Sequence, residues 1–192
     1  FVVMAASDEG ELVKMINTTV DINDRPSAFR YPRGIGVGMN LPDITEKLVI
    51  GKGRIVREGK KVAMLNFGTR LKECLIAEEN LKKKGIDLTV VDARFAKPLD
   101  ENLIWQIASN HEDIITIEEG AIGGFGSHVN FFLNEKNLLD NNLKFRSMIL
   151  PDKFIDHNKP EEMYKDAGLD ARSIELKVLE ALNSKVLIKK IN

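Results

Sequence analysis

The stretch at residues 29–34, FRYPRG, holds the residue best suited to chemistry, because an arginine follows the proline that ends a predicted strand at residues 27–31. Pro32 fixes its own φ and Gly34 allows a sharp turn, so Arg33 would project from a rigid strand end. Many α/β proteins bind ligands at such strand ends. A guanidinium group can hold a phosphate or a carboxylate through two parallel hydrogen bonds. Arg33 is therefore a candidate anion-binding residue, and a surface or interdomain salt bridge is the alternative.

Three other charged positions are interpreted as structural. Arg30 lies an odd number of residues from Arg33 and would face the other side of a continuing strand, so we expect it to be an ion-pair partner. Segment 92–100, DARFAKPLD, follows a predicted strand, and a salt-bridged loop between domains is favoured over an active-site contact. The loop around Asp156 and His157 is interpreted as a docking loop, since sequence neighbours rarely form a proton relay.

Two glycine-rich segments resemble nucleotide-binding motifs. Residues 118–128 read EEGAIGGFGSH, which could form a phosphate cradle at a helix N-terminus. The spacing is not GxGxxG and two carboxylates would repel a phosphate, so a tight strand-to-helix crossing or an interface loop is favoured. His128 is then expected to be a hydrogen-bonded structural histidine. Residues 34–38, GIGVG, are discounted because no amphipathic helix follows them.

The composition excludes several classes of function. The 192 residues carry a net charge of -1, so no general attraction to nucleic acid or to an anionic membrane is expected. No apolar run reaches the roughly 18 residues that span a bilayer. Cys74 is the only cysteine, which excludes an intramolecular disulfide, and we expect it to be a small core residue. The three histidines and one cysteine have no metal-ligand spacing.

Strands and helices alternate along most of the chain, which predicts an α/β fold with a mostly parallel sheet flanked by helices. Residues 1–40 are expected to be the last strand–helix–strand part of a preceding α/β domain, with Ser7 as the helix N-cap and Asp8, Glu9 and Glu11 as acids of the first helical turn. Residues 41–60 are expected to be a linker with a short hairpin at 53–59, and residues 184–192 a tail. Since the chain opens with an apolar strand, we expect it to be a fragment of a longer protein. The predicted strands are 61–67, 88–91, 113–117 and 143–150, and the predicted helices are 69–84, 100–111, 123–137, 160–167 and 170–183. Asp100 is the expected N-cap of the helix at 100–111.

An ordered set of motifs resembles the C-terminal third of the 1-deoxy-D-xylulose-5-phosphate synthase family over residues 1–183. These motifs are VVMAASDEGEL, FRYPRG, IGKGRIVREG, FGTRLKECL, DARFAKPLD, IEEGAIGGFGSHV, LPDKFIDH and EEMYKDAGLD. The resemblance implies a transketolase C-terminal domain at 61–183, preceded by the end of a pyrimidine-binding domain. It also implies that Arg33 holds the substrate phosphate. Transketolases and the β subunits of 2-oxo acid dehydrogenases share the architecture.

The resemblance further implies a cytoplasmic or plastid homodimer that uses thiamine diphosphate and Mg²⁺. Such an enzyme decarboxylates pyruvate and joins the two-carbon unit to glyceraldehyde 3-phosphate, for isoprenoid and thiamine synthesis. The family's cofactor and metal motifs lie in its earlier domains, so this segment is expected to have no catalytic, cofactor-binding or metal-binding residues and to be inactive alone. A transketolase, a dehydrogenase β subunit and a non-catalytic dimerisation module remain the alternatives.

Overall fold

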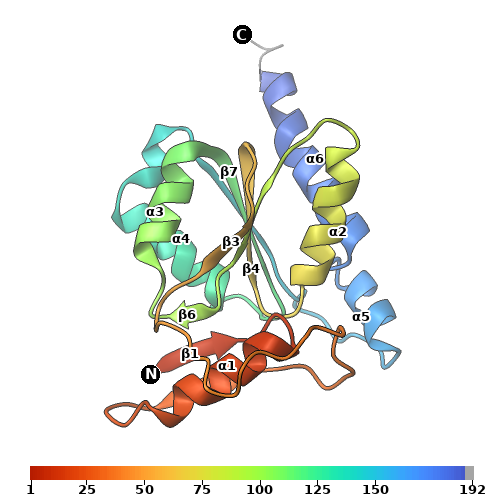
Figure 1. Ribbon diagram of the computed structural model, residues 1–192. Helices are drawn as coiled ribbons and strands as arrows, with labels where there is room; N and C mark the ends of the chain where they lie inside the picture. The colour runs from red at the N-terminus through yellow and green to blue at the C-terminus, as the bar shows by residue number, and fades with distance from the viewer. Residues whose placement is uncertain (189–192) are drawn as a thin grey trace.

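The computed structural model describes residues 1–188 and contains two β-sheets with helices packed around them (Figure 1). The larger sheet has five strands in the order β3-β5-β4-β7-β8, and the smaller has three in the order β2-β1-β6. In Figure 1 the smaller sheet lies below the larger one, at the ends of the larger sheet's strands. The α/β class that the sequence predicts is confirmed.

The five-stranded sheet is mostly parallel, as the alternation of strands and helices predicts. β4, β5, β7 and β8 run parallel to one another, whereas β3 pairs antiparallel with β5. The prediction of a local hairpin at residues 53–59 is therefore wrong, because the strand within it forms an edge of the large sheet. The strands are β3 (Arg54–Arg57), β4 (Lys61–Phe67), β5 (Thr89–Asp92), β7 (His111–Glu118) and β8 (Lys144–Met148).

Helices cover both faces of this sheet, which explains the almost continuous apolar sequence of β4. Val62 and Met64 pack on one face with α2 and α6, and Leu65 and Phe67 pack on the other with α3 and α4 (Figure 1). The side chains alternate because neighbouring residues of a strand point to opposite faces. The helices are α2 (Leu71–Lys82), α3 (Glu101–Asn110), α4 (Phe125–Glu135), the 3-10 helix η1 (Leu138–Asn141), α5 (Pro160–Asp166) and α6 (Ala171–Ile188).

The smaller sheet combines two distant parts of the chain. β1 and β2 are parallel and α1 connects them, while β6 pairs antiparallel with β1. Met4, Met15 and Phe95 fill the small core between α1 and this sheet. The sequence did not predict β6, because three residues carry too little periodicity. The elements are β1 (Val2–Ala5), α1 (Glu9–Val20), β2 (Ser27–Arg30) and β6 (Phe95–Lys97).

The sequence signals for helix ends are correct at α3 and differ by one residue at α1. Asp100 caps α3 as predicted, since its carboxylate accepts a hydrogen bond from the backbone N–H of Leu103 at 3.2 Å. The N-cap of α1 is Asp8, whose carboxylate accepts from the N–H of Glu11 at 2.8 Å. The predicted cap, Ser7, instead donates its hydroxyl hydrogen bond to the buried Asp92 at 2.8 Å.

Cys74 is fully buried in α2, which confirms its expected place in the core. Burial raises the pKa of its thiol far above the ordinary range. Of the predicted tail at 184–192, the residues up to Ile188 continue α6, and residues 189–192 lie outside the described residues. The predicted domain boundaries stay predictions.

Candidate functional site

Two loops diverge at the carboxyl ends of the neighbouring central strands β4 and β7. The chain leaves β4 through α2 towards β5, and it leaves β7 through α4 towards β8, on the opposite face of the sheet. Open α/β sheets usually bind ligands in the crevice between two such loops. The residues that fill this crevice therefore determine whether a ligand can enter it.

Arg30 of β2 reaches this crevice from the smaller sheet. Its Nη1 donates to the backbone carbonyl oxygen of Glu119 at 2.9 Å, its Nη2 donates to that of Phe67 at 3.3 Å, and its guanidinium carbon lies 5.5 Å from the Phe67 ring centroid. Within residues 1–188 no carboxylate forms an ion pair with Arg30, so its predicted ion-pair role is wrong. Carbonyl groups at a strand end that have no partner within the sheet need one from elsewhere. One arginine satisfies two of them, so a cation of the chain itself lies at the carboxyl ends of β4 and β7.

A second cluster closes the crevice beside Arg30. Arg70 Nε donates to Glu119 Oε1 at 2.9 Å, and the hydroxyl of Thr69 donates to the same oxygen. The guanidinium carbon of Arg70 lies 3.5 Å from the ring centroid of Tyr164 in α5, a cation–π geometry. Burial and the negative charge of Glu119 raise the pKa of the Tyr164 phenol. The charges in this cluster are paired with each other, which assigns the cluster a structural role.

Glu118 occupies the N-terminus of α4. Its carboxylate accepts hydrogen bonds from the backbone N–H groups of Phe125 at 3.0 Å and Gly126 at 2.8 Å, and the residue is only 2% exposed. A helix N-terminus attracts anions, and here the anion is a side chain of the same protein. The interpretation of residues 118–128 as a strand-to-helix crossing is confirmed. His128 is exposed and its ring has no hydrogen-bond partner within residues 1–188, so the expected hydrogen-bonded role is wrong.

Arg33 lies three residues beyond Arg30 and is exposed. Within the part of the chain that the structure describes, none of residues 31–36, here called the Arg33 segment, makes a hydrogen bond or ion pair. The salt bridge that was the alternative role for Arg33 is therefore not formed there. An arginine whose donors all remain available can bind an incoming anion through two hydrogen bonds.

Glu9 holds the chain immediately after the Arg33 segment. Its carboxylate accepts hydrogen bonds from three consecutive backbone N–H groups, those of Val37 at 3.0 Å, Gly38 at 2.6 Å and Met39 at 2.8 Å. Gly38 has a φ of +87°, which favours glycine. The N–H of Glu9 itself, together with those of Met39, Gly38 and Val37, holds the pKa of this carboxyl below its ordinary value.

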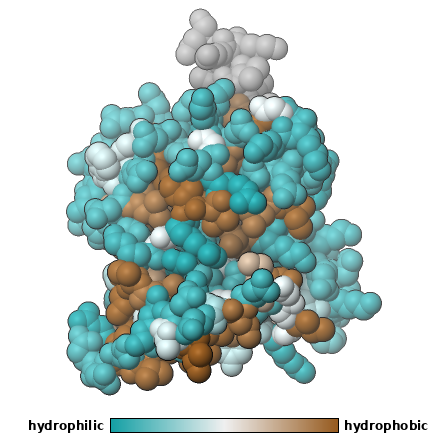
Figure 2. All heavy atoms as spheres, in the orientation of Figure 1, coloured by the Kyte–Doolittle hydropathy of each residue, from teal (hydrophilic) through white to brown (hydrophobic). Residues whose placement is uncertain are grey.

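The loop from the Arg33 segment onward is apolar as well as exposed. Ile35, Val37, Met39, Leu41 and Ile44 all lie largely open to solvent. Figure 2 shows hydrophobic residues gathered over the lower part of the molecule, where residues 1–50 lie in Figure 1. Exposed apolar patches of this kind are typical of surfaces that contact another protein surface.

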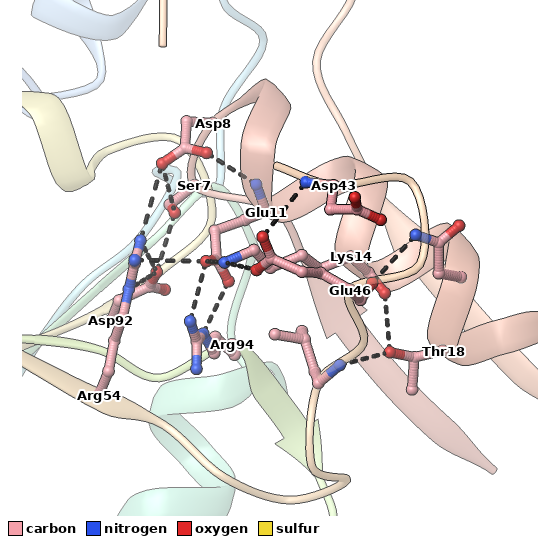
Figure 3. A network of polar contacts seen from close by, with 12 residues as sticks. Ser7, Asp8, Glu11, Lys14, Thr18, Asp43, Glu46, Arg54, Asp92 and Arg94 are labelled. Atoms are coloured by element: carbon pink, nitrogen blue, oxygen red, sulfur yellow. Dashed lines mark hydrogen bonds and ion pairs between the residues drawn. The ribbon is translucent and has the colours of Figure 1, made fainter. Parts of the chain in front are cut away.

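A network of ion pairs joins α1 to the larger sheet (Figure 3). Arg94 donates two hydrogen bonds to Glu11, from Nε at 2.7 Å and from Nη2 at 2.8 Å, and Glu11 is 2% exposed. Arg54 of β3 pairs with Glu11 at 3.3 Å and with Asp92 at 3.0 Å. Burial raises the pKa of the Asp92 carboxyl, and Arg54 opposes that shift. The interpretation of residues 92–100 as a salt-bridged loop between two parts of the protein is confirmed.

The described residues offer no place for a thiamine diphosphate or its metal ion. Residues 1–188 contain no group of three or more His, Cys, Asp or Glu side chains that could hold a metal. The helix N-terminus at α4, which could bind a diphosphate, is filled by the buried carboxylate of Glu118. In the same part of the chain, no helix combines the length and the apolar character needed to cross a membrane.

The fold is a mixed α/β domain whose sheets are flanked by helices, and it matches a transketolase C-terminal domain. The chain belongs to the transketolase C-terminal domain family, whose model matches residues 51–174.

Two solved structures are similar over nearly the whole chain. One is described as a split gene transketolase, inactive β4 tetramer, with a TM-score of 0.79 and 25% identity, and the match covers 95% of this chain and 58% of that one. The other is a transketolase from Campylobacter jejuni subsp. jejuni NCTC 11168, with a TM-score of 0.61 and 17% identity, covering 94% of this chain and 26% of that one. The chain thus spans little more than half of the first protein and about a quarter of the second.

The structure brings together residues that the sequence reasoning left apart. Glu9 was interpreted only as a first-turn acid, and its contact with residues 37–39 was missed. The alternating glycines of residues 34–38 were the available signal, because glycine allows backbone N–H groups to converge on an anion. Arg30 was predicted to be an ion-pair partner, and its actual partners are two backbone carbonyl groups that no local pattern connects to it.

Proposed function

We propose that this chain is the C-terminal part of a 1-deoxy-D-xylulose-5-phosphate synthase, in which Arg33 binds the phosphate of glyceraldehyde 3-phosphate. The observation that carries the proposal is the exposed guanidinium of Arg33, which has no hydrogen-bond or ion-pair partner within residues 1–188, on a segment that is held on both sides. The ordered motifs that resemble this family, FRYPRG above all, support the choice of substrate. In the reaction the bond between the carboxylate carbon and the carbonyl carbon of pyruvate breaks and CO2 leaves. A new carbon–carbon bond then joins the remaining two-carbon unit to the aldehyde carbon.

The role of Arg33 would be to fix the acceptor. Two hydrogen bonds from a planar guanidinium to a phosphate restrict both the position and the rotation of the bound molecule. The aldehyde at its other end would then meet the two-carbon unit in one orientation. Such orientation can contribute several kcal/mol to a reaction between two substrates.

The remaining components would come from outside the described residues. Thiamine diphosphate and Mg²⁺ would be bound by other domains of the complete enzyme, since the residues here do not fit them. The exposed apolar loop at residues 35–44 would be covered in a homodimer or by those domains. The similar split gene transketolase is described as inactive in its β4 form, which supports the proposal that this segment alone is inactive.

Transketolase is the second candidate, because both similar structures are transketolases. Arg33 would have the same role there, since a transketolase also acts on sugar phosphates. The donor distinguishes the two candidates. A complete enzyme that releases CO2 from pyruvate in the presence of glyceraldehyde 3-phosphate supports the synthase. An enzyme that uses only ketose phosphates as donors overturns the synthase and leaves transketolase.

The phosphate role is tested with Arg33→Ala in the complete enzyme, varying pyruvate and glyceraldehyde 3-phosphate separately. We expect the KM for the aldehyde phosphate to rise about 10- to 100-fold, which corresponds to the loss of about 1.5–3 kcal/mol for hydrogen bonds between charged groups. The KM for pyruvate should change little. Arg25→Ala is the matched control, because Arg25 is an exposed arginine that forms an ion pair with its neighbour Asp24. If Arg33→Ala leaves the KM for the aldehyde phosphate unchanged, Arg33 does not bind the phosphate.

A further inference from the structure

Within residues 1–188, the hydrogen bonds that hold the Arg33 segment lie at its two ends. At its upstream end, Arg30 is fixed by the carbonyl groups of Phe67 and Glu119 at the carboxyl edge of the large sheet. At its downstream end, residues 37–39 are fixed by Glu9. Within residues 1–188 the intervening six residues have no polar partner of their own, so the two ends determine where the segment lies.

The hydrogen bonds to Glu9 require one particular conformation of the backbone at residues 37–39. Its Oε2 accepts from Val37, and its Oε1 accepts from both Gly38 and Met39, so each carboxylate oxygen is used. Three successive N–H groups converge on one carboxylate only when the backbone turns, and Gly38 provides that turn with its φ of +87°. A Cβ atom on Gly36 would lie 2.7 Å from the Glu9 carboxylate, so a side chain there would displace that carboxylate from its present position.

The contact lies outside the small core. Glu9 is half-buried, residues 37–39 are exposed, and none of them belongs to the cluster between α1 and the smaller sheet. The cap of α1 is provided by Asp8, and the ion pairs that join α1 to the sheet are made by Glu11. Loss of the Glu9 carboxylate should therefore leave the fold intact and release only the loop.

We propose that Glu9 is a positioning residue that holds the Arg33 segment in place for phosphate binding. This inference rests on the proposed role of Arg33. Glu9 does not touch the substrate. Its carboxylate fixes the three N–H groups that follow the segment, and Arg30 fixes the strand that precedes it. The guanidinium of Arg33 is thereby presented from a segment whose two ends cannot move independently.

The test is Glu9→Gln in the complete enzyme. Glutamine keeps the shape but replaces one acceptor oxygen by an NH2 group, which would face backbone N–H donors. We expect the KM for glyceraldehyde 3-phosphate to rise about tenfold, since a displacement of a binding group by about 1 Å can cost up to 100-fold. The kcat at saturation, the KM for pyruvate and the rate with unphosphorylated glyceraldehyde should be unchanged. Glu46→Gln is the control, because Glu46 is a nearby surface acid that pairs with Lys14 and accepts a hydrogen bond from the backbone N–H of Asp43, outside residues 31–39.

A double-mutant cycle separates positioning from a general structural effect. If Glu9 acts through Arg33, Glu9→Gln should have no further effect on the KM for the aldehyde phosphate in an Arg33→Ala enzyme. An equal effect in both backgrounds would overturn the inference and leave the phosphate role of Arg33 intact. If Arg33→Ala itself does nothing, the proposed function fails instead.

Amide hydrogen exchange tests the contact between Glu9 and residues 37–39 without depending on catalysis. Amide hydrogen exchange at Val37, Gly38 and Met39 should accelerate in Glu9→Gln, and trypsin should cleave faster after Arg33. The exchange of the amides in β4 should stay the same, which shows that the fold is intact. Unchanged exchange at all three amides would show that Glu9 does not hold the loop and would overturn the inference.

Discussion

Arg30 and Glu119 are joined by a hydrogen bond of 2.9 Å from the Arg30 guanidinium to the Glu119 backbone carbonyl, across 89 positions of sequence. This bond places a cation of the small sheet in the crevice where a sheet of this kind usually binds its ligand. The smaller sheet therefore docks on the larger sheet at this edge. The exposed candidate for anion binding is Arg33, three residues further along the chain.

Replacing Arg30 should destabilise the protein. Arg30→Ala leaves the carbonyl groups of Phe67 and Glu119 without their donor in a partly buried site, at an expected cost of about 2–3 kcal/mol in the free energy of unfolding. Urea unfolding measures this cost, with Arg25→Ala as the exposed control. Equal midpoints for the two variants would show that Arg30 contributes nothing to the docking of the two sheets.

Replacing Glu118 should weaken the start of α4. Glu118→Ala removes the acceptor of two backbone N–H groups and leaves them buried, which should cost about 1–2 kcal/mol. Hydrogen exchange should accelerate first in the opening turn of α4, at Phe125 and Gly126. Faster exchange spread evenly over the whole domain, without any excess at those two amides, would contradict a capping role.

Breaking the bidentate pair between Arg94 and Glu11 should be costly, because Glu11 is almost fully buried. Arg94→Met should lower the free energy of unfolding by about 3 kcal/mol, since it removes a main partner of a buried charge. The double variant with Arg94→Met and Glu11→Met should lose less free energy of unfolding than the sum of the two single variants. The reason is that it leaves neither member of the pair as a charge without its partner. Strict additivity in thermal or urea unfolding would show that the pair is not coupled.

Tyr164 should ionise at higher pH than an ordinary tyrosine. Burial, followed by the charge of Glu119, raises the pKa of its phenol above 10.0. The folded protein therefore keeps this proton at a pH where the unfolded chain has lost it, so the contribution of Tyr164 to stability falls as the pH rises above 10.0. Absorbance titration checks this, because the sequence has only two tyrosines. Tyr164→Phe should remove the part of the absorbance titration that appears at the higher pH. If the curve of the variant instead loses the same fraction of its amplitude at every pH, the raised pKa of Tyr164 is refuted.

Elements with a strong local pattern were predicted closely. β4 was predicted at residues 61–67 and lies there, because a strand buried on both faces needs a continuous apolar run. The N-cap of α3 was predicted at Asp100 because a cap is a contact between residues three apart. β3 and β6 were not predicted as sheet strands, since each is a strand only through its pairing with β5 or β1.

The sequence by itself determined the α/β class, the alternation of strands and helices, and the candidacy of Arg33, because each of these depends on neighbouring residues along the chain. Only the tertiary structure decided that Arg30 lies at the carboxyl ends of β4 and β7, that Glu118 occupies the helix N-terminus, and that Glu9 holds the loop after Arg33. The reason is physical. The packing of apolar faces brings distant segments together and so decides which donor lies beside which acceptor. Because hydrophobic packing is not directional, a local sequence pattern does not predict these long-range hydrogen bonds.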